Sequence, residues 1–189
     1  MGIAERVRFS QFHNRIMDAA AAAALIPHGA TVGMSGFTGA GYPKALPQAI
    51  ADRANAEHAQ GRPYKINLWT GASTAPECDG ALAQAHAIGQ RLPFNTDPLA
   101  RQQINAGEID FIDMHLSHVA QHAWFGFFGK MNVAVIEVLG VTADGLLIPS
   151  TAIGNNKTWL EIADKVILEV NTELPGAMEG VHDIYYGTA

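Results

Sequence analysis

A short glycine-rich stretch, SGFTGAGYPK at residues 35–44, has the residue types needed to bind a negatively charged group. Its glycines, Gly36, Gly39 and Gly41, allow the backbone to adopt positive φ and a ligand to approach the main chain closely. Amides exposed in this way, next to a helix N-terminus, can donate hydrogen bonds to a phosphate, a carboxylate or a developing oxyanion. The alternative is a plain tight turn between a strand and a helix, and the residues alone leave both interpretations open.

The stretch does not match the established nucleotide-binding motifs. Its glycines are spaced as GxxGxG, whereas the dinucleotide fingerprint requires GxGxxG. The acidic residue that would hold a ribose hydroxyl is also absent, because the second apolar run ends in LWTG. The sequence contains neither GxxxxGK[ST] nor GxSxG, so it predicts neither a P-loop nor a serine nucleophile.

Three histidines, His115, His118 and His122, have the spacing i, i+3 and i+7 and would share one face of a helix. Imidazoles are zinc ligands, but this spacing is too wide for one ion on a straight helix, and no HExxH motif accompanies it. We therefore expect no metal site and interpret the three residues as a half-solvated helix face.

Other titratable residues have structural interpretations. Cys78 follows Pro76 and Glu77 at a possible helix start, where a thiol pKa can fall, but no histidine is paired with it by spacing. We interpret it as a small packing residue. Glu137 and Glu169 lie within apolar strand runs, where an acid is costly unless it has a partner. Either could be functional, and we interpret both as satisfied structural acids.

A fourth feature is FNTD at residues 94–97, which precedes the helix-like PLARQQINAG. It combines an aromatic ring with an amide, a hydroxyl and an acid. An ordinary helix cap and part of a binding pocket explain it equally well.

The elements that must position these residues follow from apolar runs and breaker residues. Strands are expected at residues 30–35, 65–70, 132–138, 145–150 and 165–170, and helices at residues 12–25, 43–60, 78–87, 98–107 and 156–164. Alternating strands and helices, with nearly continuous apolar strands, predict an α/β fold with an open, mainly parallel sheet flanked by helices. Its function is expected at the loops that leave the strand C-termini, which places residues 35–44, 71–74 and 149–156 on one rim.

Composition limits the class of protein. The chain has 189 residues, which we expect to form one domain, and a net charge of −6 with no basic stripe, so no nucleic-acid partner is expected. The apolar run at residues 19–26 is too short to cross a bilayer, and the first residues do not resemble a secretory signal. A single cysteine fits a reducing compartment, so we expect no membrane association and a cytoplasmic location.

Five segments resemble the N-terminal half of the acetyl-CoA hydrolase/transferase family. They are SGFTGAGYPK, GASTAPECDG, RLPFNTD, RQQINAGEIDFIDMHLS and IPSTAIGNNKTWLEIADKVILEVN. The resemblance runs from about residue 12 to residue 186, and neither His118 nor His122 belongs to the shared pattern.

The resemblance implies an acyl-CoA:carboxylate CoA-transferase or an acetyl-CoA hydrolase, without deciding between them. Members of the family have two related α/β domains with the reaction in the cleft between them. The nucleophile is a glutamate of the second domain, the substrate is a coenzyme A thioester, the acceptor is a small carboxylate or water, and no cofactor is bound covalently. That second domain has no counterpart here, so we assign no catalytic residue and expect the chain to be inactive alone, with the missing C-terminal domain or a second copy as its partner.

By resemblance, this half contributes a substrate-binding wall. The corresponding residues are Gly36, Phe37, Thr38, Gly39, Ala40, Gly41, Tyr42, Pro43, Ser73, Thr74, Phe94, Asn95 and Thr96. In this interpretation Phe37 and Phe94 exclude water. The alternative function is a non-catalytic module that binds a small phosphate or carboxylate compound on the same rim.

Overall fold

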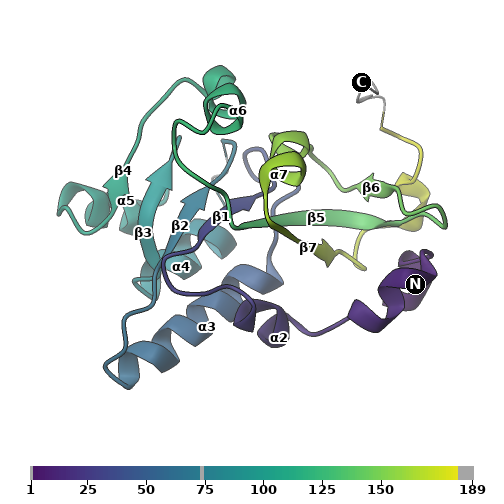
Figure 1. Ribbon diagram of the computed structural model, residues 1–189, viewed down its shortest axis with the longest axis horizontal. Helices are drawn as coiled ribbons and strands as arrows, with labels where there is room; N and C mark the ends of the chain where they lie inside the picture. Colours follow the sequence, from purple (N-terminus) through teal and green to yellow (C-terminus); the bar gives the residue numbers. More distant parts are fainter. Residues whose placement is uncertain (1, 73–74, 183–189) are drawn as a thin grey trace.

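The computed structural model describes residues 2–72 and 75–182. Its strands are β1 Thr31–Met34, β2 Ile66–Trp69, β3 Ile88–Leu92, β4 Asp110–Phe111, β5 Val133–Val141, β6 Leu147–Pro149 and β7 Lys165–Val170. Within these described ranges they form one sheet in the order β4-β3-β2-β1-β5-β6, with β7 also paired to β5 (Figure 1). Every pair is parallel except β5–β6, which confirms the predicted open, mainly parallel sheet.

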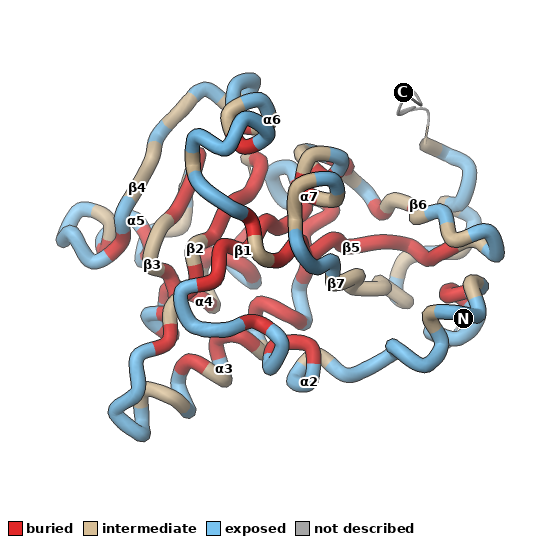
Figure 2. The backbone as a smooth tube through the Cα atoms, viewed as in Figure 1, coloured by how far each residue is buried: buried red, intermediate tan, exposed pale blue. Residues whose placement is uncertain are grey.

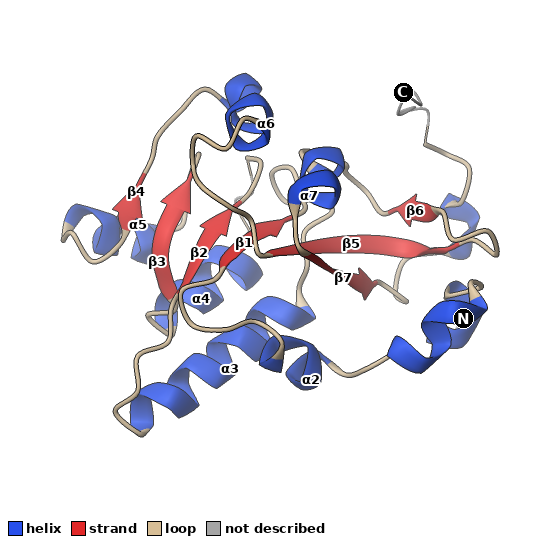
Figure 3. Cartoon of the chain, in the orientation of Figure 1, coloured by secondary structure: helices blue, strands red, loops and turns tan. Residues whose placement is uncertain are grey.

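Helices flank the sheet. They are α1 Ile3–Arg6, α2 Ala19–Ala24, α3 Ala45–Ala59, α4 Ala81–Gln84, α5 Pro98–Asn105, α6 Leu116–Trp124 and α7 Asn156–Ile162. Short 3₁₀ segments lie at Ser10–Arg15 and Gly176–Met178, and a π-helical turn at Pro76–Gly80 precedes α4. Figure 3 shows α2, α3 and α4 on one side of the strands and α6 and α7 on the other. No helix among the described residues is long and apolar enough to span a membrane.

The central strands are buried on both faces because successive side chains point to opposite sides of a sheet. In β2, Leu68 packs into the core beneath α2, α3 and α4, whereas Trp69 packs into the core beneath α6 and α7. In β5, Val135 packs into the first of these cores and Ala134 into the second. Figure 2 shows this burial along β1, β2 and β5, and it explains why these strands read as continuous apolar runs.

One prediction about the elements is wrong, and two strands, β3 and β4, were not predicted. The helix expected at residues 12–25 is interrupted, because the Asp18 carboxylate accepts a hydrogen bond of 2.8 Å from the Ala21 amide and starts α2 as a separate helix. Strand β3 was not predicted, because its sequence IGQRL contains a glutamine and an arginine. Arg91 is fully buried and forms an ion pair of 2.6 Å with the fully buried Asp79, a contact that no local pattern reveals.

The order of the strands places β1 at a reversal of direction. From β1 the chain passes through α3 to β2 on one side, whereas β5 lies on the other side of β1. Ligands of open α/β sheets bind outside the carboxyl ends of the strands at such a point. The loop after β1, residues 35–44, is therefore in the expected position for a site.

Candidate ligand-binding rim

Three loops meet at Gly36, and together we call their described residues the rim: residues 35–44 after β1, residues 71–72 after β2, and residues 150–155 between β6 and α7. A Cβ atom built at Gly71 or at Gly154 would lie 2.9 Å from the Gly36 carbonyl oxygen. The Thr38 amide donates a hydrogen bond of 2.7 Å to the Ala72 carbonyl. The prediction that these loops share one rim is confirmed, and glycines at positions 71 and 154 allow their backbones to touch Gly36.

The first loop folds back on itself around Thr38 and Gly39. The Phe37 amide donates to the Ala40 carbonyl at 2.9 Å, and the Ala40 amide donates to the Phe37 carbonyl at 3.1 Å. Gly36 and Gly41 adopt φ values of +118° and +66°, but the third positive φ of the loop, +52°, belongs to Thr38. The expectation that Gly39 supplies positive φ is wrong, and a Cβ atom at Gly39 would meet nothing within 4 Å.

Most amides of this loop are already used. Those of Phe37, Thr38 and Ala40 donate to carbonyl groups within the rim. The amides of Gly36, Gly39, Gly41 and Tyr42 donate to no acceptor in residues 2–72 or 75–182, and of these four residues only Gly39 is exposed. The tip of the loop therefore presents the backbone of Gly39 and the Phe37 side chain, which is 45% exposed, to solvent.

The N-terminus of α3 is occupied by Glu169 of β7. The two oxygens of this carboxylate accept hydrogen bonds from the amides of Lys44, Ala45 and Leu46 at 2.6, 3.1 and 2.9 Å. These are the amides that a helix start leaves unpaired, and the carboxylate also offsets the positive end of the helix dipole. The amides at this helix start are therefore already used by Glu169, and the interpretation of Glu169 as a satisfied structural acid is confirmed.

Glu137 of β5 is likewise satisfied. One oxygen of its buried carboxylate accepts hydrogen bonds from Lys44 Nζ at 2.5 Å and from Asn171 Nδ2 at 3.2 Å. The amide of Glu137 donates to Ser35 Oγ at 2.9 Å, and Ser35 Oγ donates to the Gly41 carbonyl at 2.7 Å. Both ends of the first loop are thus fastened to β5, and the structural interpretation of Glu137 is confirmed.

Tyr42 is a buried residue of the loop. Its hydroxyl donates a hydrogen bond of 2.9 Å to Glu77, and Lys44 Nζ lies 4.1 Å from the centre of its ring. Burial, followed by the hydrogen bond to Glu77, raises the pKa of Tyr42 to about 12, so the hydroxyl is a donor at neutral pH. Gly41, Tyr42 and Pro43 are buried and shape the loop, whereas Phe37, Thr38 and Gly39 are exposed.

The segment 94–97 follows β3 and acts as a helix cap. Asn95 Oδ1 accepts a hydrogen bond of 3.0 Å from the Asp97 amide, and Asp97 Oδ1 accepts one of 2.8 Å from the Ala100 amide at the start of α5. Phe94 is 44% exposed and Thr96 is exposed. Over the described ranges, no hydrogen bond joins residues 94–96 to residues 35–44. The cap interpretation is confirmed, and Ser73 and Thr74 lie outside the described residues.

Cys78 packs in the core. Its Sγ lies 3.6 Å from Met34 Sδ, and burial raises the pKa of the thiol well above its ordinary value. The packing interpretation is confirmed. Burial also raises the pKa of the neighbouring Asp79 carboxyl, against the opposing effect of Arg91.

The three histidines follow one side of α6, with His115 at its N-cap. The ring centres of His115 and His118 are 5.6 Å apart, and those of His118 and His122 are 5.9 Å apart. The His122 ring stacks on Phe128. No group of three or more His, Cys, Asp or Glu side chains in the described part of the chain is placed to hold a metal ion.

The loop between β6 and α7, together with the first residue of α7, contains polar atoms that the sequence analysis did not single out. Ser150 Oγ, Asn155 Nδ2 and Asn156 Oδ1 are buried and have no hydrogen-bond partner among the described residues. Asn155 Nδ2 lies 4.0 Å from a Cβ atom built at Gly71, at the point where the three loops meet. The only signal in the sequence was the pair of asparagines after Gly154, which is also typical of a turn.

Comparison with known sequences identifies close relatives. The model of the acetyl-CoA hydrolase/transferase N-terminal domain matches residues 1–188. A succinyl-CoA:acetate CoA-transferase of Clostridium kluyveri is 41% identical over 181 residues, covering 96% of this chain and 33% of the relative. A propanoyl-CoA:succinate CoA transferase of Escherichia coli is 48% identical over 155 residues, covering 82% and 32%. An acetyl-CoA hydrolase of Saccharomyces cerevisiae is 34% identical over 187 residues, covering 95% and 35%. The chain spans about a third of the length of these relatives.

Solved structures share the fold. RipA from Yersinia pestis is similar with a TM-score of 0.66 at 18% sequence identity, over 88% of this chain and 39% of RipA. Glutaconate coenzyme A-transferase from Acidaminococcus fermentans is similar with a TM-score of 0.58 at 13% identity, over 81% of this chain and 68% of that protein. At these identities the likeness concerns the fold.

Proposed function

Because the chain belongs to the acetyl-CoA hydrolase/transferase family, we propose that its rim is one wall of a site for an acyl-CoA thioester, whose attacking carboxylate comes from a second domain. The chain then corresponds to the N-terminal domain of a longer enzyme. That enzyme transfers coenzyme A to a small carboxylate or hydrolyses the thioester.

The convergence of three loops on Gly36 carries this proposal. It brings the exposed backbone of Gly39, the exposed Phe37 ring and the glycine-rich backbones to the carboxyl end of β1. Such a wall suits a thioester. The carbonyl oxygen of the thioester gains negative charge when a carboxylate attacks the carbonyl carbon, and a fixed amide stabilises that charge. An aromatic ring beside that amide excludes water from the acyl group.

The carboxylates around the rim support a nucleophile from elsewhere. Glu169 caps α3, Glu137 pairs with Lys44, and Glu77 accepts the hydrogen bond of Tyr42. A glutamate that attacks a thioester needs an oxygen free to reach the carbonyl carbon in the correct geometry. Each of these three acids is instead held by its own partner.

The decisive experiment compares the chain alone with the chain joined to a second domain. The 189-residue protein is incubated with acetyl-CoA and succinate, and formation of succinyl-CoA and free CoA is followed. We expect no turnover from the chain alone, and turnover after fusion to the C-terminal two thirds of the Clostridium kluyveri relative. Turnover by the chain alone that disappears in Glu77→Gln would place the nucleophile on this rim and overturn the proposal.

A second candidate function is a non-catalytic module for a small phosphate or carboxylate compound. The commitment of Glu77, Glu137 and Glu169 to structural partners favours it, since a binding module needs no free acid. Saturable binding of acetyl-CoA or acetyl phosphate to the rim, together with an inactive fusion protein, would support the module over the enzyme.

We also propose that an exposed aromatic group at the end of α6 contacts the second domain or, without it, a second copy. Trp124, Phe125 and Phe127 are 53%, 67% and 72% exposed. Large aromatic side chains gathered on a surface mark sites of protein–protein contact.

A further inference from the structure

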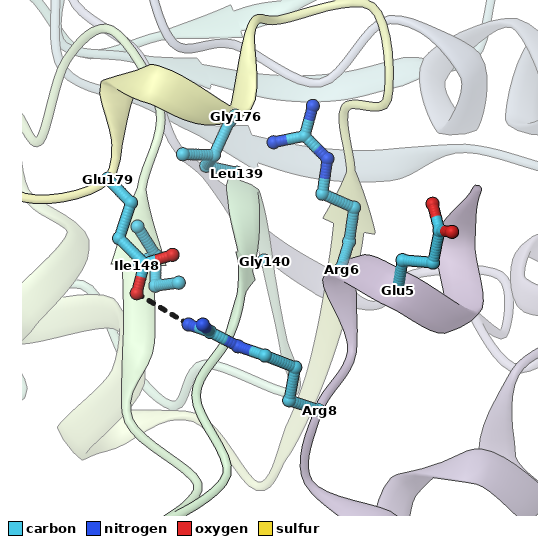
Figure 4. A pocket seen from close by; sticks show the side chains of 8 residues that line it. All are labelled: Glu5, Arg6, Arg8, Leu139, Gly140, Ile148, Gly176 and Glu179. Atoms are coloured by element: carbon cyan, nitrogen blue, oxygen red, sulfur yellow. Dashed lines mark hydrogen bonds and ion pairs between the residues drawn. The ribbon is translucent and has the colours of Figure 1, made fainter. Parts of the chain in front are cut away.

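A pocket of about 330 Å³ lies where the N-terminal segment crosses the second half of β5 (Figure 4). Leu139, Gly140 and Ile148 form its apolar part, from β5 and β6. Arg6 and Arg8 supply the cationic side. No residue of the rim lines this pocket, so it is built from other elements than the proposed substrate wall.

Arg6 is the unusual residue of this pocket. It is only 6% exposed, and its guanidinium donates to the Leu174 carbonyl through Nη2. Its Nε is buried and has no hydrogen-bond partner, and Arg6 forms no ion pair with any described residue. A buried guanidinium without a counter-charge is strongly unfavourable, so an anion bound next to Arg6 would be stabilised.

The carboxylates that line the pocket are engaged elsewhere. Glu179 Oε1 lies 2.5 Å from Arg8 Nη2, with both side chains nearly half exposed. Glu5 Oε2 accepts a hydrogen bond of 2.8 Å from the Gly2 amide, and Glu5 forms no ion pair with Arg6. Neither acid neutralises Arg6.

The backbone holds Arg6 in place. Val7 forms a parallel bridge with Val141, and the Arg8 amide donates to the Val141 carbonyl at 2.9 Å. The Arg6 carbonyl oxygen lies only 2.5 Å from where a Cβ atom at Gly140 would be. The glycine therefore lets this segment lie directly on β5, and the hydrogen bond to the Leu174 carbonyl holds the guanidinium before any ligand arrives.

We propose that this pocket binds a small carboxylate with a short apolar body. The carboxylate pairs with the guanidinium of Arg6, whose planar fork suits two carboxylate oxygens. The apolar body lies against Leu139 and Ile148. The cavity has the size of a site for a small molecule and is too small for a whole coenzyme A. The inference does not depend on the function proposed for the rim.

The test is titration of the 189-residue chain with butyrate and with inorganic phosphate at constant ionic strength, followed by calorimetry. We expect saturable binding of butyrate, at least tenfold weaker binding in Arg6→Gln, and an unchanged affinity in Arg101→Gln, a matched change of an exposed arginine on α5. Phosphate is expected to bind more weakly, because it has no apolar body. Phosphate binding as tight as that of butyrate would overturn the carboxylate assignment.

A second measurement needs no variant and stays informative if Arg6→Gln does not fold. The NMR signal of the Arg6 Nε–H group is expected to shift as butyrate is added and to saturate with the calorimetric affinity. Absence of saturable binding, or a signal that does not respond, would overturn the proposal.

Discussion

Lys44 Nζ lies 2.5 Å from a carboxylate oxygen of Glu137, and this contact fastens the end of the glycine-rich loop to the centre of β5. The Glu137 side chain is 1% exposed and that of Lys44 is 43% exposed. The same Nζ donates to the Tyr42 carbonyl at 2.8 Å. The loop is therefore held in place by an ion pair between a half-exposed lysine and a buried glutamate.

Replacing Lys44 by methionine should lower the free energy of unfolding, because Glu137 would remain buried without its cation. Removing one partner of a fully buried pair costs about 3–5 kcal/mol, and because Lys44 is half exposed we expect about 2 kcal/mol. Urea denaturation measures the change. Lys130→Met is the control, since its pair with Asp164 at 2.8 Å is exposed, and its loss should be below about 0.5 kcal/mol. Equal losses in the two variants would contradict a special role for Lys44.

Replacing Glu169 by alanine should destabilise α3 from its first turn. The loss of a helix cap costs about 1–2 kcal/mol, and the amides of Ala45 and Leu46 would become unpaired. We expect faster hydrogen exchange at these amides together with a lower free energy of unfolding. Glu173→Ala, an exposed change after β7, should leave both unchanged. If exchange at Ala45 and Leu46 does not respond, the carboxylate does not cap the helix.

Some features of the site could be predicted from the sequence and others could not, and the cap shows why. The glycine-rich loop follows an apolar strand, so its place at the carboxyl end of the sheet was predictable from periodicity. Glu169 lies 125 residues from Lys44, and only the pairing of β7 with β5 brings its carboxylate to α3. Strand β3 was missed for the same reason, because the charge of Arg91 is matched by Asp79 through the tertiary fold.

The stability of the protein should fall between about pH 10 and pH 12 through Tyr42. Its pKa is raised from 10.0 to about 12, so the folded protein holds this proton more tightly than the unfolded chain does. The contribution is complete below pH 10 and is lost as the pH rises through the folded pKa, with a total of at most about 3 kcal/mol. Denaturation as a function of pH, compared between the wild type and Tyr42→Phe, isolates this term. Parallel curves for the two proteins would contradict the raised pKa.

Gly39→Val should lower the turnover of the fusion protein without lowering its stability. The position has open space and no positive φ, so a side chain fits, but it would stand beside the free amide at the tip. We expect a fall in turnover of about tenfold to a hundredfold, in line with the loss of one oxyanion donor. Gly2→Val is the control, because Gly2 also has open space and no positive φ. Unchanged turnover in Gly39→Val would separate the tip of the loop from the chemistry.

For Gly41→Val we expect the opposite result for stability. Comparing it with Gly39→Val separates loss of turnover caused by unfolding of the loop from loss caused at its tip. A Cβ atom at Gly41 would lie 2.8 Å from the Ala152 amide nitrogen, and its φ of +66° disfavours a side chain. Gly41→Val should therefore lower stability and turnover together, because the loop between β6 and α7 must move. Thermal unfolding of the chain alone distinguishes the two variants.

The exposed aromatic side chains after α6 should make the chain associate with itself. Trp124, Phe125 and Phe127 lie within one short segment, and burying them against a second copy removes apolar surface from water. Sedimentation velocity should show a larger species as the concentration rises, and Phe125→Glu combined with Phe127→Glu should leave a monomer. Leu146→Glu, at a residue that is 66% exposed elsewhere, should not change the association. Because the proposed second domain would cover the same surface, the fusion protein should stay monomeric. If the wild-type chain remains monomeric at high concentration, there is no reason to place the second domain on this surface.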